Sequence, residues 1–283
     1  MRQACELLGL SYRQGKRLWV RYRKDGAAGL QHGLCGRVSN HGYGAEHRAK
    51  VLKRVAERYG DFGPTLASEH LAADDQLTVS PETLRRWLRA AGEPCVHKRR
   101  AYRKRREPKA HFGELVQLDG SFHDWLEDRG GKGCLMHLVD DATSTAVFSF
   151  SKEETTWAAA GLLRAWIERH GVPKALYTDW KNVYVREATE REKLKGIEPV
   201  SQFGRMCRRL GIRIIAAGSP QAKGRVERAH GTHQDRLVKK LRLAGIGSYE
   251  EANRYVETSY LEEHNRHFGA SRLRTRTSIA NHP

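Results

Sequence analysis

The stretch Leu115-Val-Gln-Leu-Asp-Gly-Ser-Phe122 alternates apolar and polar side chains, which is the pattern of a half-buried β-strand. Two more strands are predicted at 134–139 and 145–150, and the turn between them contains Asp140 and Asp141. The elements that follow are predicted as a helix at 154–170, a strand at 175–178, a helix at 203–210, a strand at 212–216, and helices at 219–244 and 249–265. Three strands followed by alternating helices and strands predict an α/β domain with a mixed sheet.

Three carboxylates occupy informative places in this order of elements. Asp119 lies on the first strand, Asp179 at the end of the fourth, and Glu227 on the helix after the fifth. If the first and fourth strands are neighbours, both aspartates reach one edge of the sheet and the glutamate helix packs across it. Three converging acids are unfavourable unless cations neutralise them, and the hard ions Mg²⁺ and Mn²⁺ prefer oxygen ligands. These three residues are therefore the predicted metal-binding and catalytic residues, and two ions held there suit phosphoryl transfer.

A simpler interpretation exists for each of these acids. Each aspartate, taken singly, can belong to a turn at a strand end. Glu227 can pair with Lys223 one helical turn earlier, an exposed ion pair of small energetic value. Asp140 and Asp141 suit a hairpin turn better than a metal site. His230 is predicted to be a neighbour of the site and not a ligand.

The charge of the chain is concentrated in its first part. The whole sequence carries a formal net charge of +18, and residues 1–110 alone hold 24 basic and 11 acidic side chains. A surface of this sign condenses onto phosphates and releases their counterions, so double-stranded DNA is the predicted partner. Ordinary solubilising charge is the alternative.

Two helical units are predicted before the sheet. Residues 1–30 form a partial helix-turn-helix, residues 31–44 a linker, and residues 45–96 a second helix-turn-helix. The last helix of each unit begins after a serine N-cap, Ser11 or Ser80. A three-helix bundle with a solvated basic face is the alternative for the second unit. The predicted DNA contacts in these units are Arg13, Gln14, Lys16, Arg17, Arg85, Arg86 and Arg89.

Further DNA contacts are predicted outside the helical units. Residues 97–111 form a basic linker, because residues 97–110 contain eight Lys or Arg side chains that repel one another unless phosphates neutralise them. The linker residues expected to contact phosphates are Lys98, Arg99 and Arg100. Around the glutamate, Lys223, Arg225 and Arg228 are placed to hold DNA phosphates, with a solvated basic face as the alternative.

Several classes of protein are excluded by composition. No window approaches eighteen apolar residues and the first residues lack the apolar core of a signal peptide, so neither a membrane span nor secretion is expected. Five scattered cysteines without a Cys-x-x-Cys pair argue against a disulfide framework and a zinc finger. The expected location is cytoplasmic and nucleoid-associated.

Three segments together carry a resemblance to a known family. Leu118-Asp-Gly120, Tyr177-Thr-Asp179 and Ser219-Pro-Gln-Ala-Lys-Gly-Arg-Val-Glu-Arg228 resemble the catalytic segments of integrase-core DDE transposases, most closely the ISNCY type of bacterial insertion-sequence transposase. The resemblance implies an RNase H-like core at 112–268 preceded by all-α helix-turn-helix units. It also implies that Asp119, Asp179 and Glu227 bind the metal ions.

The activity that this resemblance implies is cleavage and strand transfer. Water first frees a 3′-hydroxyl at a transposon end, and that hydroxyl then attacks target DNA. The resemblance also implies action on transposon ends and target DNA, and joining two ends implies a homodimer or a higher oligomer on DNA.

Two other functions stay open from the residues: an inactive transposase remnant that only binds DNA, and a metal-dependent nuclease without strand transfer. The basic tail at 269–283 has no apolar pattern and is expected to be a truncated or aberrant end.

Overall fold

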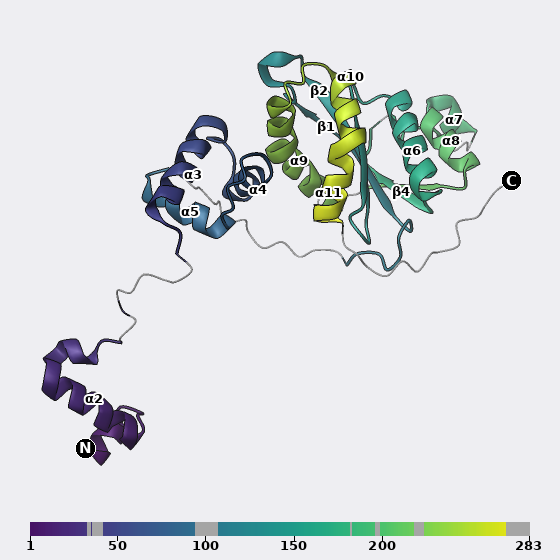
Figure 1. The fold of residues 1–283 in the computed structure, drawn as a ribbon. Helices are drawn as coiled ribbons and strands as arrows, with labels where there is room; N and C mark the ends of the chain where they lie inside the picture. Colours follow the sequence, from purple (N-terminus) through teal and green to yellow (C-terminus); the bar gives the residue numbers. More distant parts are fainter. Residues whose placement is uncertain are drawn as a thin grey trace. The chain divides into compact units, whose positions relative to one another are not determined.

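The computed structural model describes residues 1–32, 35, 42–93, 107–181, 183–195, 199–217 and 224–269 (Figure 1). The chain divides into two compact units, residues 1–95 and 96–283, and each is described by itself.

The first unit is helical in both of its described parts. Its elements are α1 (Arg2–Leu7), α2 (Tyr12–Asp25), the short 3₁₀ helix η1 (Gly26–Leu30), α3 (Ala45–Arg58), α4 (Pro64–Asp74) and α5 (Pro81–Ala90). The predicted N-caps are confirmed, because Ser11 Oγ accepts a hydrogen bond from the Gln14 backbone N–H and Ser80 Oγ accepts one from that of Thr83, both at 3.2 Å.

The two helical parts differ in how much they bury. Helix α2 buries no side chain. The helices α3, α4 and α5 share a core that includes Val51, Val55, Leu66, Leu71 and Leu84. Residues 42–93 therefore form a three-helix unit with a hydrophobic core of its own.

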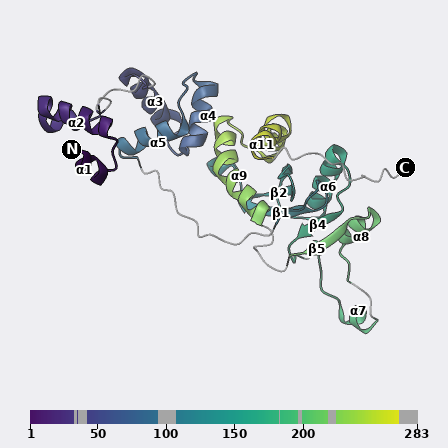
Figure 2. The same cartoon turned by 90° about the horizontal axis from the view of Figure 1, so that it is seen from below.

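The second unit contains a mixed five-stranded sheet in the order β3-β2-β1-β4-β5. The strands are β1 (Val116–His123), β2 (Gly133–Asp140), β3 (Ala146–Ser151), β4 (Ala175–Thr178) and β5 (Arg213–Ala216), with the 3₁₀ turn η2 (Glu127–Arg129) after β1. Strands β1, β2 and β3 pair antiparallel, whereas β1, β4 and β5 pair parallel. Figure 2 shows β2, β1, β4 and β5 in succession. This arrangement confirms the predicted α/β class with a mixed sheet.

Helices cover both faces of this sheet (Figure 1). The helices of the second unit are α6 (Thr156–His170), α7 (Glu190–Leu194), α8 (Gln202–Arg209), α9 (Gly224–Leu243), α10 (Tyr249–Tyr255), the π-helical turn η4 (Val256–Tyr260) and α11 (Leu261–Phe268). One core holds Leu118 and Met136 against Trp166 of α6 and Phe203 of α8. The other holds Leu135, Val139 and Phe148 of the sheet against α9, α10 and η4. Strand β2 is therefore buried on both faces, and its alternate side chains enter different cores.

Two asparagines hold the edge strand β3. Asn253 of α10 accepts a hydrogen bond from the Phe150 backbone N–H at 2.6 Å and donates one to the Phe150 carbonyl at 3.0 Å. Asn265 of α11 makes the same pair of bonds with Ala146, at 2.8 and 2.9 Å. The predicted single helix at 249–265 is thus interrupted by η4 and anchored on each side of it by an amide. Among the described helices, none is both long and apolar enough to cross a membrane.

We predict that Asn265→Leu lowers the free energy of unfolding by about 1–3 kcal/mol, because it removes both bonds and leaves the Ala146 backbone groups without them. Urea unfolding followed by circular dichroism measures this loss. Glu262→Ala on the same helix is the control, since its exposed ion pair with Arg266 contributes little. Equal losses in the two variants would show that the amide bonds do not stabilise the edge strand.

Candidate functional site

The pairing of β1 with β4 places two aspartates side by side. In the parallel register, Gln117 lies opposite Tyr177. Asp119 and Asp179 each follow two residues later, so they reach the same level, in the middle of β1 and just past the end of β4. The structure thus supports the expectation, made from the order of elements, that the first and fourth strands are neighbours.

Glu154 is a third carboxylate at this place, and sequence analysis did not identify it. Carboxylate oxygens of Asp119, Glu154 and Asp179 all lie within 4.8 Å of one another. Glu154 precedes the N-cap Thr155 of α6, and its side chain is only 4% exposed. A Cβ on Gly120 would lie 2.7 Å from Glu154 Oε2 and 2.8 Å from Cys134 Sγ, so any larger residue at 120 would clash with them. We call Asp119, Glu154 and Asp179 the acid cluster.

A lysine and a tyrosine bind the acid cluster from within the protein. The Lys181 ammonium donates a short hydrogen bond to Glu154 and lies 3.4 Å from Asp179 Oδ2. The Tyr184 hydroxyl donates to Glu154 Oε1 at 2.7 Å. Burial alone would lower the pKa of Lys181, but its bond to Glu154 and the surrounding negative charges raise it above its ordinary value. The positive charge of Lys181 therefore offsets part of the repulsion in the cluster.

Among the described residues, the acid cluster does not include Glu227. Glu227 lies on the first turn of α9, where its side chain is exposed. This helix runs along β1 and contacts it through Val226, His230 and Gln234, which are spaced four residues apart. The Val226 backbone N–H donates to Gln117 Oε1 at 3.2 Å, and Gln234 Nε2 donates to Ser121 Oγ at 3.2 Å.

Between these two contacts, His230 Nδ1 lies 3.9 Å from Asp119 Oδ2, in agreement with its predicted place beside the site. Because residues three apart are neighbours on a helix surface, Glu227 is adjacent to the histidine that contacts Asp119.

The hairpin acids Asp140 and Asp141 are buried and serve the fold. Asp140 accepts hydrogen bonds from the backbone N–H groups of Gly113, Ala142 and Thr143 at 2.7–3.0 Å. Burial raises its pKa despite these bonds. Asp141 Oδ1 receives Arg225 Nε at 3.2 Å and Gln117 Nε2 at 2.9 Å. These contacts agree with the predicted turn role. Because replacing either aspartate would remove buried hydrogen bonds, neither residue can serve as a mutagenesis control that leaves the fold unchanged.

The predicted DNA contacts have different environments in the structure. Exposed side chains are Arg13, Gln14, Lys16 and Arg17 on α2, Arg86 and Arg89 on α5, and Arg228 on α9. Arg85 is partly buried and bonded to Glu82. Arg225 is also partly buried and donates to Ser144 Oγ at 3.0 Å in addition to Asp141, so it ties α9 to the hairpin. Lys98, Arg99, Arg100 and Lys223 lie outside the described residues.

The donor atoms of the acid cluster suit a hard divalent cation. All three ligands are carboxylates, which Mg²⁺ and Mn²⁺ prefer over nitrogen or sulfur. The cluster lies where β4 ends beside the middle of β1. Its side chains are partly accessible there, as the 14% exposure of Asp119 and the 26% exposure of Asp179 show. The site can therefore hold a divalent ion if Lys181 gives up its position.

Comparison with known proteins relates the chain to transposases. No known protein-family profile matches it. It is 42% identical over 277 residues to the protein of Sinorhizobium fredii (strain NBRC 101917 / NGR234) named "Putative transposase y4bF", and this match covers 97% of the chain and 60% of that protein. It is 29% identical over 306 residues to the transposase for insertion sequence IS1202 of Streptococcus pneumoniae, covering 95% of the chain and 64% of that protein. The chain thus spans somewhat less than two thirds of each relative.

Solved structures give weaker matches. The HTLV-2 integrase catalytic core domain in complex with magnesium is 19% identical and has a TM-score of 0.40, over 52% of this chain and 86% of its own. A chain of the simian T-cell lymphotropic virus intasome in complex with the PP2A regulatory subunit B56 gamma is 18% identical and has a TM-score of 0.43, over 73% of this chain and 67% of its own. On the two sequence matches, nearly the whole of this chain is similar to part of each of two bacterial proteins named as transposases.

Proposed function

We propose that this chain is a DDE-type DNA transposase that cleaves transposon ends and joins them to target DNA. The observation that carries the proposal is the level placement of Asp119 and Asp179 on paired parallel strands, in a chain related to transposases. The substrate class is double-stranded DNA, and the reaction class is phosphoryl transfer. The ISNCY type remains the prediction made from the sequence.

The metal ligands that we propose are the three carboxylates predicted from the sequence. Mg²⁺ or Mn²⁺, as two ions, would be held by Asp119, Asp179 and Glu227 and would activate the attacking oxygen and stabilise the leaving oxygen of a phosphodiester. The first two residues are fixed by the sheet. Glu227 is supplied by α9, which the Gln117 and Ser121 contacts hold along β1.

The roles of the other polar residues differ from that of the three ligands. Glu154 is fixed by Tyr184 and holds Lys181 among the acids. His230 positions Asp119 from α9. These residues keep the carboxylates close together while cationic or hydrogen-bonding groups offset their repulsion.

DNA is held outside the sheet by basic helices. The exposed arginines of α2 and α5 would contact phosphates and groove edges of a transposon end, with Arg228 near the reacting strand. Two ends must be brought together for transposition, so we expect a homodimer or a higher oligomer on DNA.

We predict that Asp119→Asn, Asp179→Asn and Glu227→Gln each reduce metal-dependent cleavage of a transposon-end duplex by about a hundredfold or more, while DNA binding persists. Each change keeps the side-chain shape but weakens one charged oxygen ligand, and losing one group that stabilises transition-state charge typically has an effect of this size. Cleaved and joined strands are resolved on denaturing gels.

The matched control is Asp235→Asn, a carboxyl-to-amide change on the same helix as Glu227, whose carboxylate pairs with Lys239. It should keep near-parental activity. Near-parental cleavage by Glu227→Gln would contradict its assignment. Cleavage by the parent without joined products would favour a nuclease, and no cleavage with either ion would favour a remnant.

We predict that Lys181→Met increases the stabilisation by Mn²⁺ and tightens Mn²⁺ binding by about tenfold. Without metal, loss of this cation leaves the carboxylates to repel one another, so the melting temperature should fall; Mn²⁺ should then restore it. Thermal unfolding at increasing Mn²⁺ measures both effects. Lys193→Met is the control, because that lysine pairs with Glu190 on α7, outside the acid cluster. The same Mn²⁺ response in Lys181→Met and the parent would contradict the competition between lysine and metal.

We predict that the double variant Arg86→Ala/Arg89→Ala binds duplex DNA more weakly than the parent, with a salt slope smaller by about 2, because each lost phosphate contact removes about 0.9 from the slope. Fluorescence anisotropy over a series of salt concentrations measures this change. The control Arg164→Ala/Arg266→Ala removes the same charge from exposed helix surfaces of the second unit. Equal weakening of DNA binding by the two double variants would contradict a specific role of α5, because binding would then depend only on the net charge of the protein.

A further inference from the structure

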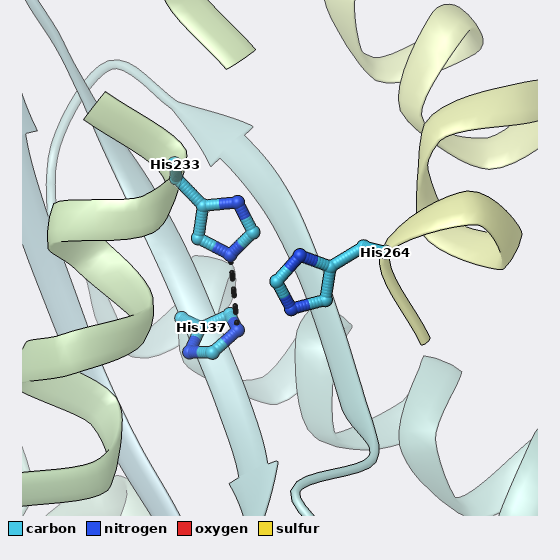
Figure 3. Close-up of side chains that lie close together, drawn as sticks. All are labelled: His137, His233 and His264. Atoms are coloured by element: carbon cyan, nitrogen blue, oxygen red, sulfur yellow. Dashed lines mark hydrogen bonds between the residues drawn. The ribbon is translucent and has the colours of Figure 1, made fainter. Parts of the chain in front are cut away.

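Three buried histidines from three different elements meet between the sheet and the helices. His137 comes from β2, His233 from α9 and His264 from α11 (Figure 3). Their exposed fractions are 0%, 0% and 4%. Imidazoles gathered away from water need partners for their nitrogens, because a buried polar atom without a hydrogen bond destabilises the folded state. We call these residues the histidine cluster.

The distances within the histidine cluster fit a tetrahedral metal site. One nitrogen of each ring lies within 4.8 Å of those of the other two. His137 Nε2 and His233 Nε2 share a hydrogen bond at 3.3 Å (Figure 3), and a zinc ion between them would take the place of its proton. Zinc–nitrogen bonds of about 2.0–2.1 Å in a tetrahedron separate two ligand atoms by about 3.3 Å. Two of the rings therefore already have the spacing of zinc ligands, and the third is one small side-chain movement away.

Hydrogen bonding within the protein accounts for only part of the cluster. In the described part of the chain, Nδ1 of His137 and Nδ1 of His264 are buried and make no hydrogen bond. His233 Nδ1, in contrast, lies 3.3 Å from the Tyr260 hydroxyl. A histidine that binds metal through one nitrogen commonly uses the other to bond such a group, which fixes the ring. Tyr260 therefore orients His233 with Nε2 directed at the cluster.

The surroundings keep these rings in the form that binds metals. Burial lowers the pKa of His137 and of His233 well below 6.5, with the neighbouring histidines adding to the effect. Burial likewise lowers the pKa of His264 to about 4. Phe148 packs against the rings of His233 and His264, with centroids 4.4 and 5.3 Å away. Neutral imidazoles in a dry pocket present lone pairs rather than positive charge.

We propose that His137, His233 and His264 form a site for a zinc-class divalent ion, separate from the acid cluster. Three nitrogen donors favour zinc over Mg²⁺ or Ca²⁺, which take oxygen ligands. The fourth position is left to a water molecule or a small anion. Such an ion would join α9 and α11 to the central part of the sheet, next to the strand that carries Asp119, since His137 lies opposite Asp119 in the register of β1 and β2.

The test uses the full chain without a polyhistidine tag, stripped with a chelator and kept in excess Mg²⁺ so that hard-ion sites are filled. Zinc binding is measured by competition with a chromophoric chelator, and bound zinc by mass spectrometry. We expect about one tightly bound zinc per chain and a rise in melting temperature on zinc addition. In His264→Asn, zinc affinity should fall by more than about a hundredfold and the rise should disappear.

Matched variants separate this site from others. His267→Asn changes an exposed histidine on the same helix and should bind zinc like the parent. Asp179→Asn should also keep the zinc, which distinguishes the histidine cluster from the acid cluster. Cobalt bound to the parent should give the visible absorption of a four-coordinate ion with nitrogen ligands, and this readout decides the matter if His264→Asn does not fold. Failure of the parent to bind zinc or cobalt at micromolar concentration, or equal binding by His264→Asn, would overturn the proposal.

Discussion

Repulsion between carboxylates on neighbouring strands is the constraint on which the site depends. The parallel register of β1 and β4 fixes Asp119 and Asp179 at one level, and Glu154 adds a third negative charge within the same 4.8 Å. Such a group of acids is stable only with compensating charge or hydrogen bonds. Lys181 and Tyr184 supply both at Glu154. The missing side chain of Gly120 is what permits Glu154 to come this close.

The sequence predicted the parts of this arrangement that depend on local pattern. Alternation of side chains located β1, a serine cap located the start of α2 and of α5, and the order of elements brought Asp119 and Asp179 together. Glu154 escaped prediction because its partners are 27 and 30 residues away and nothing around it marks a site. Arg225 was expected to face DNA, yet it bonds a turn 84 residues earlier in the chain. Contacts of this kind depend on tertiary packing and leave no periodic signal.

Helix α9 connects the chemical and structural roles of the sheet. Its first turns follow β1 and bring His230 to Asp119, and its next turn places His233 against His137 on β2. One face of one helix therefore contacts both the acid cluster and the histidine cluster. Because Glu227 sits on the first turn of the same helix, its position relative to Asp119 depends on how firmly α9 is held further along. The contacts of α9 with β2 and the position of Glu227 relative to Asp119 are thus linked through one helix.

The amides that anchor β3 also determine how this sheet can meet other chains. A strand at the edge of a sheet presents unpaired backbone groups on which a second chain can grow by strand addition, the usual route to unwanted aggregation. Here Asn253 and Asn265 occupy the outward backbone groups of Phe150 and Ala146, which lie four residues apart on the edge strand β3. Two amide side chains thus take two of the backbone positions that an added strand would pair with. Partner molecules that assemble with this domain at that edge must therefore do so through side-chain surfaces, and not by extending the sheet.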